Sequence, residues 1–175
     1  PRFRGSPVRV VGPLVRFAAD ALRIDVRVVA TVEAHGKHFF IRFGYLWVHL
    51  HLGLFGKWRI SPGAAPDVRG QIRLRLLNDS SYAELRGPTV CELLDDESKK
   101  AAVARLGPDP IKKSDPTPAR NRVERRNAAI GAQLMDPKLF AGVGNTYPAA
   151  GLVRRHTPPH RPGHAPRVTD RACSG

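Results

Sequence analysis

The first ninety residues carry the pattern of several short β-strands. Residues 71–77 (QIRLRLL) alternate strictly, so their apolar side chains fall on one strand face and their two arginines on the other. The apolar side chains are Ile72, Leu74 and Leu76, and the arginines are Arg73 and Arg75. The polar run 78–81 supplies turn chemistry, and residues 82–85 are expected to return as the hairpin partner.

Three further segments of this part favour strands. Residues 24–33 (IDVRVVATVE) are rich in Val and Ile, residues 37–43 (KHFFIRF) are aromatic and β-branched, and LWVHLHL follows at 46–52. Several short strands in succession indicate a β-sandwich or a barrel.

After residue 90 the pattern becomes helical. Residues 91–105 (CELLDDESKKAAVAR) have a helical composition, and the run 107–110 (GPDP) stops it. The Pro-rich, charged stretch 111–120 is typical of an interdomain linker. Two helices are expected at about 121–135 and about 146–155.

The fold class predicted from these patterns is a multi-part α+β fold. A β-sandwich occupies 1–106, a linker 107–120, a helical element 121–163 and an irregular tail 164–175.

The charge of the chain is +14 and is unevenly distributed. Residues 1–60 carry ten basic and three acidic side chains, residues 61–119 nine of each, and residues 120–175 ten and three. Two basic regions around a neutral middle suit a polyanion gripped between two domains, because neutralising phosphates releases counterions. An arginine-rich chain without such a partner would have the same composition.

Other sequence features narrow the class of protein. Cys91 and Cys173 are the only cysteines, so a disulfide framework is not expected. No apolar run is long enough to cross a bilayer, and the opening PRFRGSPVRV lacks the apolar core of a signal peptide. We expect a cytoplasmic protein with no membrane partner.

The sharpest motif is IGAQLMDPKLFAGVGNTY at 130–147. Gly142 and Gly144 allow close approach of a ligand or a positive φ, and Asn145 stands where it would cap the next helix. Such a turn can hold a DNA phosphate on free backbone N–H groups. The plainer interpretation is an ordinary corner between two helices.

This motif resembles the helix–two-turn–helix element of the formamidopyrimidine/endonuclease VIII DNA glycosylases. The segments VEAHGKHFFIRFG (32–44), LWVHLHLGLFGKWR (46–59), YAELRGPTVCELL (82–94) and LGPDP (106–110) occur in that family's order and spacing. They are most similar to the endonuclease VIII branch of actinobacterial type, over about residues 3–163.

The resemblance implies functions for the residues that match. Lys37 corresponds to a strand lysine at the active site that binds the phosphate beside the damaged nucleotide, and Asn145 to a phosphate-binding asparagine. Leu54 and Phe55 correspond to the loop that fills the gap left by an everted base. Arg86, in LRGP, is expected to face DNA. Without the resemblance, Lys37 could be a solvated lysine, and Leu54 and Phe55 could be core residues at a strand end.

The resemblance also implies that both ends of the family architecture are missing. Family members begin with a proline whose amino nitrogen is the nucleophile, followed by a glutamate, whereas Arg2 follows Pro1 here. The four-cysteine zinc finger at the family's C-terminus cannot form from one remaining cysteine, so we expect no metal or other cofactor. Pro148 and Gly151 stand where the family has arginine and glutamate.

The histidines offer a rival metal site. His49 and His51 share a strand face, and His156, His160 and His164 are spaced by four in a Pro-rich stretch that cannot form one helical face. No carboxylate partner stands at suitable spacing, so the sequence does not favour a metal site here.

Three interpretations remain open at this stage. The first is a monomeric base-excision-repair glycosylase with AP lyase activity on oxidised bases in damaged double-stranded DNA, with Lys37 as the catalytic candidate. The second is a non-catalytic DNA-binding remnant, and the third is a gene fragment that does not fold stably.

Overall fold

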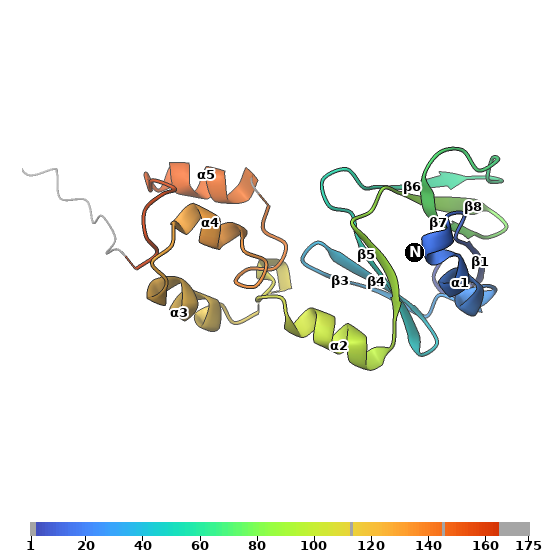
Figure 1. Cartoon of the computed structure of the whole chain (residues 1–175), viewed down its shortest axis with the longest axis horizontal. Helices are drawn as coiled ribbons and strands as arrows, with labels where there is room; N and C mark the ends of the chain where they lie inside the picture. Colours follow the sequence, from blue (N-terminus) through green and yellow to red (C-terminus); the bar gives the residue numbers. More distant parts are fainter. Residues whose placement is uncertain (1–2, 113, 145, 165–175) are drawn as a thin grey trace, which may run out of the picture. The chain divides into compact units, whose positions relative to one another are not determined.

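The computed structural model describes residues 3–112, 114–144 and 146–164 (Figure 1). The chain divides into two compact units, Pro1–Val103 and Ala104–Gly175. In the described parts, all the strands belong to the first unit, and the second is built from short helices. None of the helices described is long and apolar enough to span a lipid bilayer.

The first unit is a sandwich of two antiparallel sheets. Within the described residues, one sheet has five strands in the order β2-β1-β7-β8-β6, and the other has four in the order β3-β4-β5-β9. The strands are β1 (Pro7–Val11), β2 (Arg27–Val28), β3 (Thr31–His35), β4 (His38–Phe43), β5 (Leu46–His51), β6 (Lys57–Pro62), β7 (Ile72–Leu77), β8 (Ser81–Arg86) and β9 (Val90–Leu94). The expected β-sandwich is therefore confirmed.

The core lies between the two sheets. The strands that line it contribute alternate side chains, as half-buried strands should. The five-stranded sheet contributes Val8, Val10, Leu74, Leu76, Ala83 and Leu85, and the four-stranded sheet Ile41, Phe43, Leu46, Val48 and Leu50. Full burial of one such aliphatic or aromatic side chain stabilises the fold by about 1.5–3 kcal/mol, so this layer is the main source of stability.

The hairpin predicted from 71–77 and 82–85 is present. β7 pairs with β8, and the Asn78 side chain closes the turn because its Oδ1 accepts the backbone N–H groups of Ser80 and Ser81 at 3.1 and 2.8 Å. A register shift between Ile72 and Leu74 interrupts the strict alternation. Leu74 and Leu76 nevertheless lie in the core as predicted.

The segment 24–33 is not one strand. Ile24 is the last residue of helix α1 (Val15–Ile24), whose buried face is Phe17, Ala21 and Ile24 at helical spacing. β2 then pairs with β1 in one sheet, and β3 pairs with β4 in the other. The Val-rich pattern was correct for extended backbone, but it did not reveal that the chain crosses from one sheet to the other.

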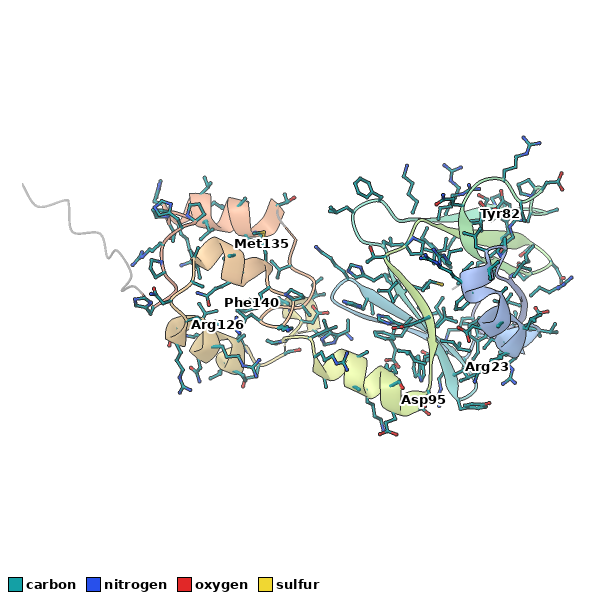
Figure 2. The ribbon with its side chains drawn as sticks, in the orientation of Figure 1. Arg23, Tyr82, Asp95, Arg126, Met135 and Phe140 are labelled. Atoms are coloured by element: carbon teal, nitrogen blue, oxygen red, sulfur yellow. The ribbon has the colours of Figure 1, made fainter. Side chains whose placement is uncertain are left out.

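The segment 91–105 is not one helix. Residues Val90–Leu94 form β9, which pairs with β5, and helix α2 begins only at Asp96 and ends at Ala104. Asp95 caps this helix, since its Oδ1 accepts the Ser98 N–H at 2.7 Å; Figure 2 labels Asp95 at this helix end. Cross-strand pairing with β5 thus outweighs the helical composition of the first residues.

In the second unit the helices are α3 (Thr117–Arg125), α4 (Ile130–Met135) and α5 (Thr146–Arg154), with a 3-10 turn η1 at Pro110–Lys112. The helix predicted over about 121–135 is divided, because Ala128, between α3 and α4, and Ile130, the first residue of α4, bond to the segment that follows α5. Ile130 N donates to Arg161 O at 2.7 Å, and Gly163 N donates to Ala128 O at 3.2 Å. The helix predicted at about 146–155 is present as α5.

The stretch predicted as a linker, 107–120, lies within the second unit. Gly107 N donates to Pro137 O at 2.8 Å, and Ala141 N donates to Pro108 O at 3.1 Å. A Cβ atom at position 107 would lie 2.3 Å from the Leu139 carbonyl, so only glycine fits there. Proline and glycine here serve close packing, and α3 begins already at Thr117.

Candidate nucleic-acid interface

The loop between β5 and β6 presents two large apolar side chains to solvent. Leu54 is 89% exposed and Phe55 is 86% exposed. Gly53 adopts a left-handed φ of +68°, and Gly56 N donates to Leu52 O at 3.0 Å, so the loop is a tight turn. The interpretation of Leu54 and Phe55 as core residues is therefore wrong. We call residues 52–56 the apolar loop.

The apolar loop rests against the connection between β8 and β9. Thr89 N donates to His51 O at 2.9 Å. A Cβ atom at Gly53 would lie 2.0 Å from Thr89 Oγ1, so the backbone of the loop and the Thr89 side chain are in close contact. A rigid base under exposed apolar side chains suits a wedge, because a flexible loop would fold those side chains back onto the protein.

Lys37 lies in the turn between β3 and β4. Gly36 supplies the positive φ of +57° that this turn requires, and Lys37 is exposed. His38, the next residue, pairs in register with His51 at the end of β5, immediately before the apolar loop. The three cationic or titratable side chains Lys37, His38 and His51 thus gather at one end of the four-stranded sheet.

The histidines of this group are held largely uncharged. Burial, followed by the charges of His51, His49 and His35, lowers the pKa of His38 to about 4. Burial, His49 and then Lys37 lower the pKa of His51. Lys37 is therefore close enough to His51 to affect its charge, a relationship that sequence analysis missed because it treated His51 only as a metal ligand.

His49, which the sequence offered as a metal ligand together with His51, is hydrogen-bonded through both of its ring nitrogens. His49 is 5% exposed, and its Nδ1 lies 2.8 Å from Glu92 Oε1 while its Nε2 lies 2.8 Å from His38 Nδ1. Glu92 is a carboxylate partner that the sequence did not reveal, because β9 reaches β5 only through sheet pairing. Both His49 nitrogens have protein partners, and no three metal-ligating side chains in the described part of the chain are arranged to hold an ion.

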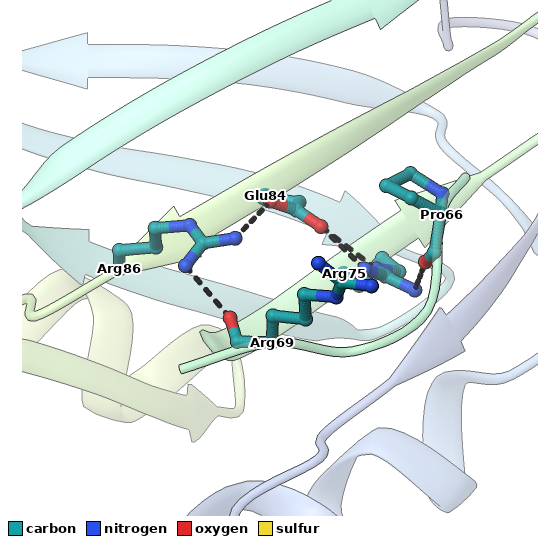
Figure 3. Close-up of polar contacts among 5 residues, drawn as sticks. All are labelled: Pro66, Arg69, Arg75, Glu84 and Arg86. Carbon is teal, nitrogen blue, oxygen red and sulfur yellow. Dashed lines mark hydrogen bonds and ion pairs between the residues drawn. The ribbon is translucent and has the colours of Figure 1, made fainter. Parts of the chain in front are cut away.

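Arg86 belongs to an ion-pair network on the five-stranded sheet (Figure 3). It donates to Glu84 Oε2 and to the Arg69 carbonyl, both at 2.8 Å. Arg75 binds the other Glu84 oxygen through Nε at 3.1 Å and the Pro66 carbonyl at 2.8 Å. Burial alone would raise the pKa of Glu84, but hydrogen bonds from Arg86 and Arg75 outweigh it and lower that pKa. Arg86 thus has structural partners, while its side chain stays 43% exposed.

The second unit contains the helix–turn–helix segment expected to grip phosphate. Between α4 and α5 the chain turns at Asp136, whose carbonyl accepts the N–H groups of Leu139 and Phe140 at 2.9 and 3.0 Å; Figure 2 labels Phe140 in this turn. Gly142 adopts a φ of +83°, as its place in the motif predicts.

Asn145 lies outside the described residues, as do Pro1, Arg2 and Cys173. Pro148 is buried in the first turn of α5, where proline is tolerated.

Comparison with known proteins agrees with this architecture. Residues 6–90 match the formamidopyrimidine-DNA glycosylase N-terminal domain. The chain is 44% identical to endonuclease 8 1 of Mycobacterium tuberculosis, over 93% of this chain and 63% of that protein. It is 36% identical to endonuclease 8 2 of Mycobacterium bovis, over 75% and 53%. The chain thus spans less than two-thirds of the length of these relatives.

The fold is also that of a solved family structure. A complex of Lactococcus lactis Fpg with DNA containing an abasic site superimposes with a TM-score of 0.80 at 17% identity, over 94% of this chain and 65% of that one. The domain match, the relatives and the sandwich agree with the motifs in the sequence, and the chain belongs to the formamidopyrimidine-DNA glycosylase/endonuclease VIII family.

Proposed function

We propose that the chain provides the damage-facing part of a base-excision-repair DNA glycosylase with AP lyase activity, acting as a monomer on oxidised bases in duplex DNA. The observation that carries this proposal is the apolar loop, whose Leu54 and Phe55 are almost fully exposed on a turn held by Thr89. Leaving two such side chains in water is unfavourable by itself, and a gap in a base stack offers them a place to be buried.

The phosphates flanking that gap need cations nearby. We assign this contact to Lys37, together with His51 at the adjoining end of β5. Lys37 Nζ is a compact point charge that suits a phosphate oxygen. Asn145 is proposed to bind a second phosphate from the other unit, and Arg86 a third, since its side chain stays 43% exposed. The net charge of +14 favours encounter with duplex DNA, and the bacterial nucleoid is the location we propose.

The proposed role of the apolar loop is tested by comparing two labelled duplexes, one intact and one with a tetrahydrofuran abasic-site analogue. The double variant L54A/F55A is expected to lose most of the preference for the abasic duplex while retaining affinity for the intact one. Variant I111A is the matched control, since Ile111 is 90% exposed and lies in the other unit. Equal preference for the abasic duplex in all three proteins would refute the wedge.

Catalysis is tested separately by borohydride trapping on abasic DNA. An amine that attacks the sugar C1′ with loss of water leaves an imine, and reduction converts it to a stable adduct. Lys37 is the catalytic candidate among the described residues, so a trapped adduct that persists in K37A excludes it as the imine former.

A second candidate function is damage binding without catalysis. The observation that favours it is that the exposed apolar loop and the net charge of +14 serve DNA binding without requiring a catalytic group. Abasic-site preference without any trapped adduct would support this alternative, whereas an adduct would exclude it.

A further inference from the structure

A chain of hydrogen bonds crosses three strands on the outer face of the four-stranded sheet. Glu92 of β9, His49 of β5 and His38 of β4 are linked through contacts of 2.8 Å on each side of the His49 ring. The rings of Phe40 and His49 are stacked at 4.6 Å, and His38 lies 5.1 Å from His49 and 4.6 Å from His51. The buried His49 ring therefore couples the exposed Glu92 carboxylate to His38, which lies next to Lys37.

The chemistry of the partners determines where the hydrogens lie. An ionised carboxylate can only accept, so His49 Nδ1 carries a hydrogen and donates it to Glu92. A neutral His49 then has its lone pair on Nε2, which accepts the hydrogen of His38 Nδ1. His38 is left with its lone pair on Nε2. Glu92 thus determines which atom donates and which accepts in each hydrogen bond of this series.

In the absence of DNA, the groups around His38 oppose its protonation. His38 is close to His35 on β3, to His49 and His51 on β5 and, at the adjoining turn, to Lys37; Lys99 of α2 lies 5.6 Å from the Phe40 ring at the other end. Glu92 is hydrogen-bonded to His49, whereas Glu33 on the same sheet face pairs with Lys99 at 2.6 Å. A phosphate arriving at Lys37 and His51 would relieve this positive neighbourhood and favour protonation of His38.

We propose that Glu92 and His49 are positioning residues for the DNA-phosphate contact: they hold His38 as the Nδ1–H tautomer, so that its Nε2 takes up a proton when a phosphate binds beside Lys37 and His51. The inference rests on the proposed function, because it assigns a proton to the phosphate site of the same surface. Phosphate binding is then coupled to proton uptake, and affinity for duplex DNA rises as the pH falls from about 6.5 towards 4.

The experiment measures binding of the whole chain to the tetrahydrofuran duplex by fluorescence anisotropy across this pH range at constant ionic strength. The E92A variant removes the acceptor of His49 and is expected to bind roughly fivefold more weakly, the effect of one lost hydrogen bond. E92Q retains an oxygen that accepts from His49 Nδ1 and is expected to restore most of the affinity. E33A is the matched control, since it removes one carboxylate from the same sheet face.

Simple electrostatics predicts the opposite result, because removing either carboxylate makes the protein more positive and DNA binding tighter. The positioning role is overturned if E92A binds at least as tightly as E33A at every pH. It is also overturned if nitrogen-15 spectra of the His38 ring place the hydrogen of the neutral form on Nε2. If K37A binds the duplex as tightly as the parent, the proposed phosphate site is refuted. If K37A binds weakly but E92A and E33A have equal affinities, only the positioning role of Glu92 is refuted. Thermal melting of each variant verifies that it is folded.

Discussion

Gly53 lies so close to Thr89 that a Cβ atom at position 53 would be 2.0 Å from Thr89 Oγ1. The turn that exposes Leu54 and Phe55 is thus fixed by two constraints, a left-handed backbone and a side chain pressed against it. The two constraints can be separated by mutation.

We expect G53A to destabilise the first unit by about 1–2 kcal/mol from the left-handed backbone, plus a contribution from the Thr89 contact. Gly63 is a matched control, because its φ of +81° is similar and no atom lies within 4 Å of a Cβ placed there. The excess cost of G53A over G63A in urea unfolding measures the contact with Thr89. The double variant G53A/T89A should remove that excess, and an excess that persists would show that Thr89 does not confine the loop.

The ion pair between Arg75 and Glu84 is expected to be a large contributor to stability. Both side chains are less than a tenth exposed, so E84A leaves an uncompensated buried charge and should lower the free energy of unfolding by about 3–5 kcal/mol. E33A, at the more exposed pair with Lys99, should cost less than about 1 kcal/mol. If the double variant R75M/E84L recovers most of the lost free energy of unfolding, the destabilisation of E84A is caused by the unpaired charge and not by lost volume.

Glu84 also gives stability a pH dependence. Its pKa is lower in the folded protein than its ordinary value of 4.5, because Arg86 and Arg75 stabilise the carboxylate. The unfolded chain therefore binds more protons, and this contribution is present above pH 4.5 and is lost as the pH falls through the folded pKa. Urea unfolding of E84Q should depend less on pH in this range than that of the parent, and identical slopes would contradict the assignment.

His38 acts in a higher pH window. Its pKa is about 4 in the folded protein and 6.5 in the unfolded chain, since burial and neighbouring histidines oppose its charge. Stability is therefore lost as the pH falls from 6.5 towards 4, by about 1–2 kcal/mol after allowance for solvent screening of a part-exposed ring. The H38Q variant should reduce this loss, as measured by chemical unfolding at pH values across the window.

Cys91 is expected to be unreactive while the protein is folded. Burial is the main reason that its thiol pKa rises from 9.0 to about 12, which leaves about a thousandfold less thiolate at neutral pH. In a C173S background, alkylation by iodoacetamide should be slow in buffer and rapid in urea. Equal rates in both conditions would show that Cys91 is accessible in the native state.

Much of the first unit was predictable because its signals are local. Alternation identified β7, turn chemistry identified its hairpin with β8, and glycines on either side marked the apolar loop. The errors occurred where pairing across the sandwich decided the outcome, as in 91–105, where β9 adds to β5 before α2 begins. Composition alone cannot distinguish a helix from an edge strand there, because the deciding hydrogen bonds come from residues about forty positions away.

The sequence by itself determined the family, the two basic regions, and the candidates Lys37, Leu54 and Phe55. Only the tertiary structure decided that Leu54 and Phe55 are exposed, that Arg86 is tied to Glu84, and that Glu92 reaches His49. The physical reason is that a motif fixes residue identity and local backbone, whereas burial and hydrogen-bond partners depend on sheet register between strands that are distant in sequence. This register places Glu92 beside His49 and His49 beside His38, so that the three side chains form a hydrogen-bonded series that ends beside Lys37.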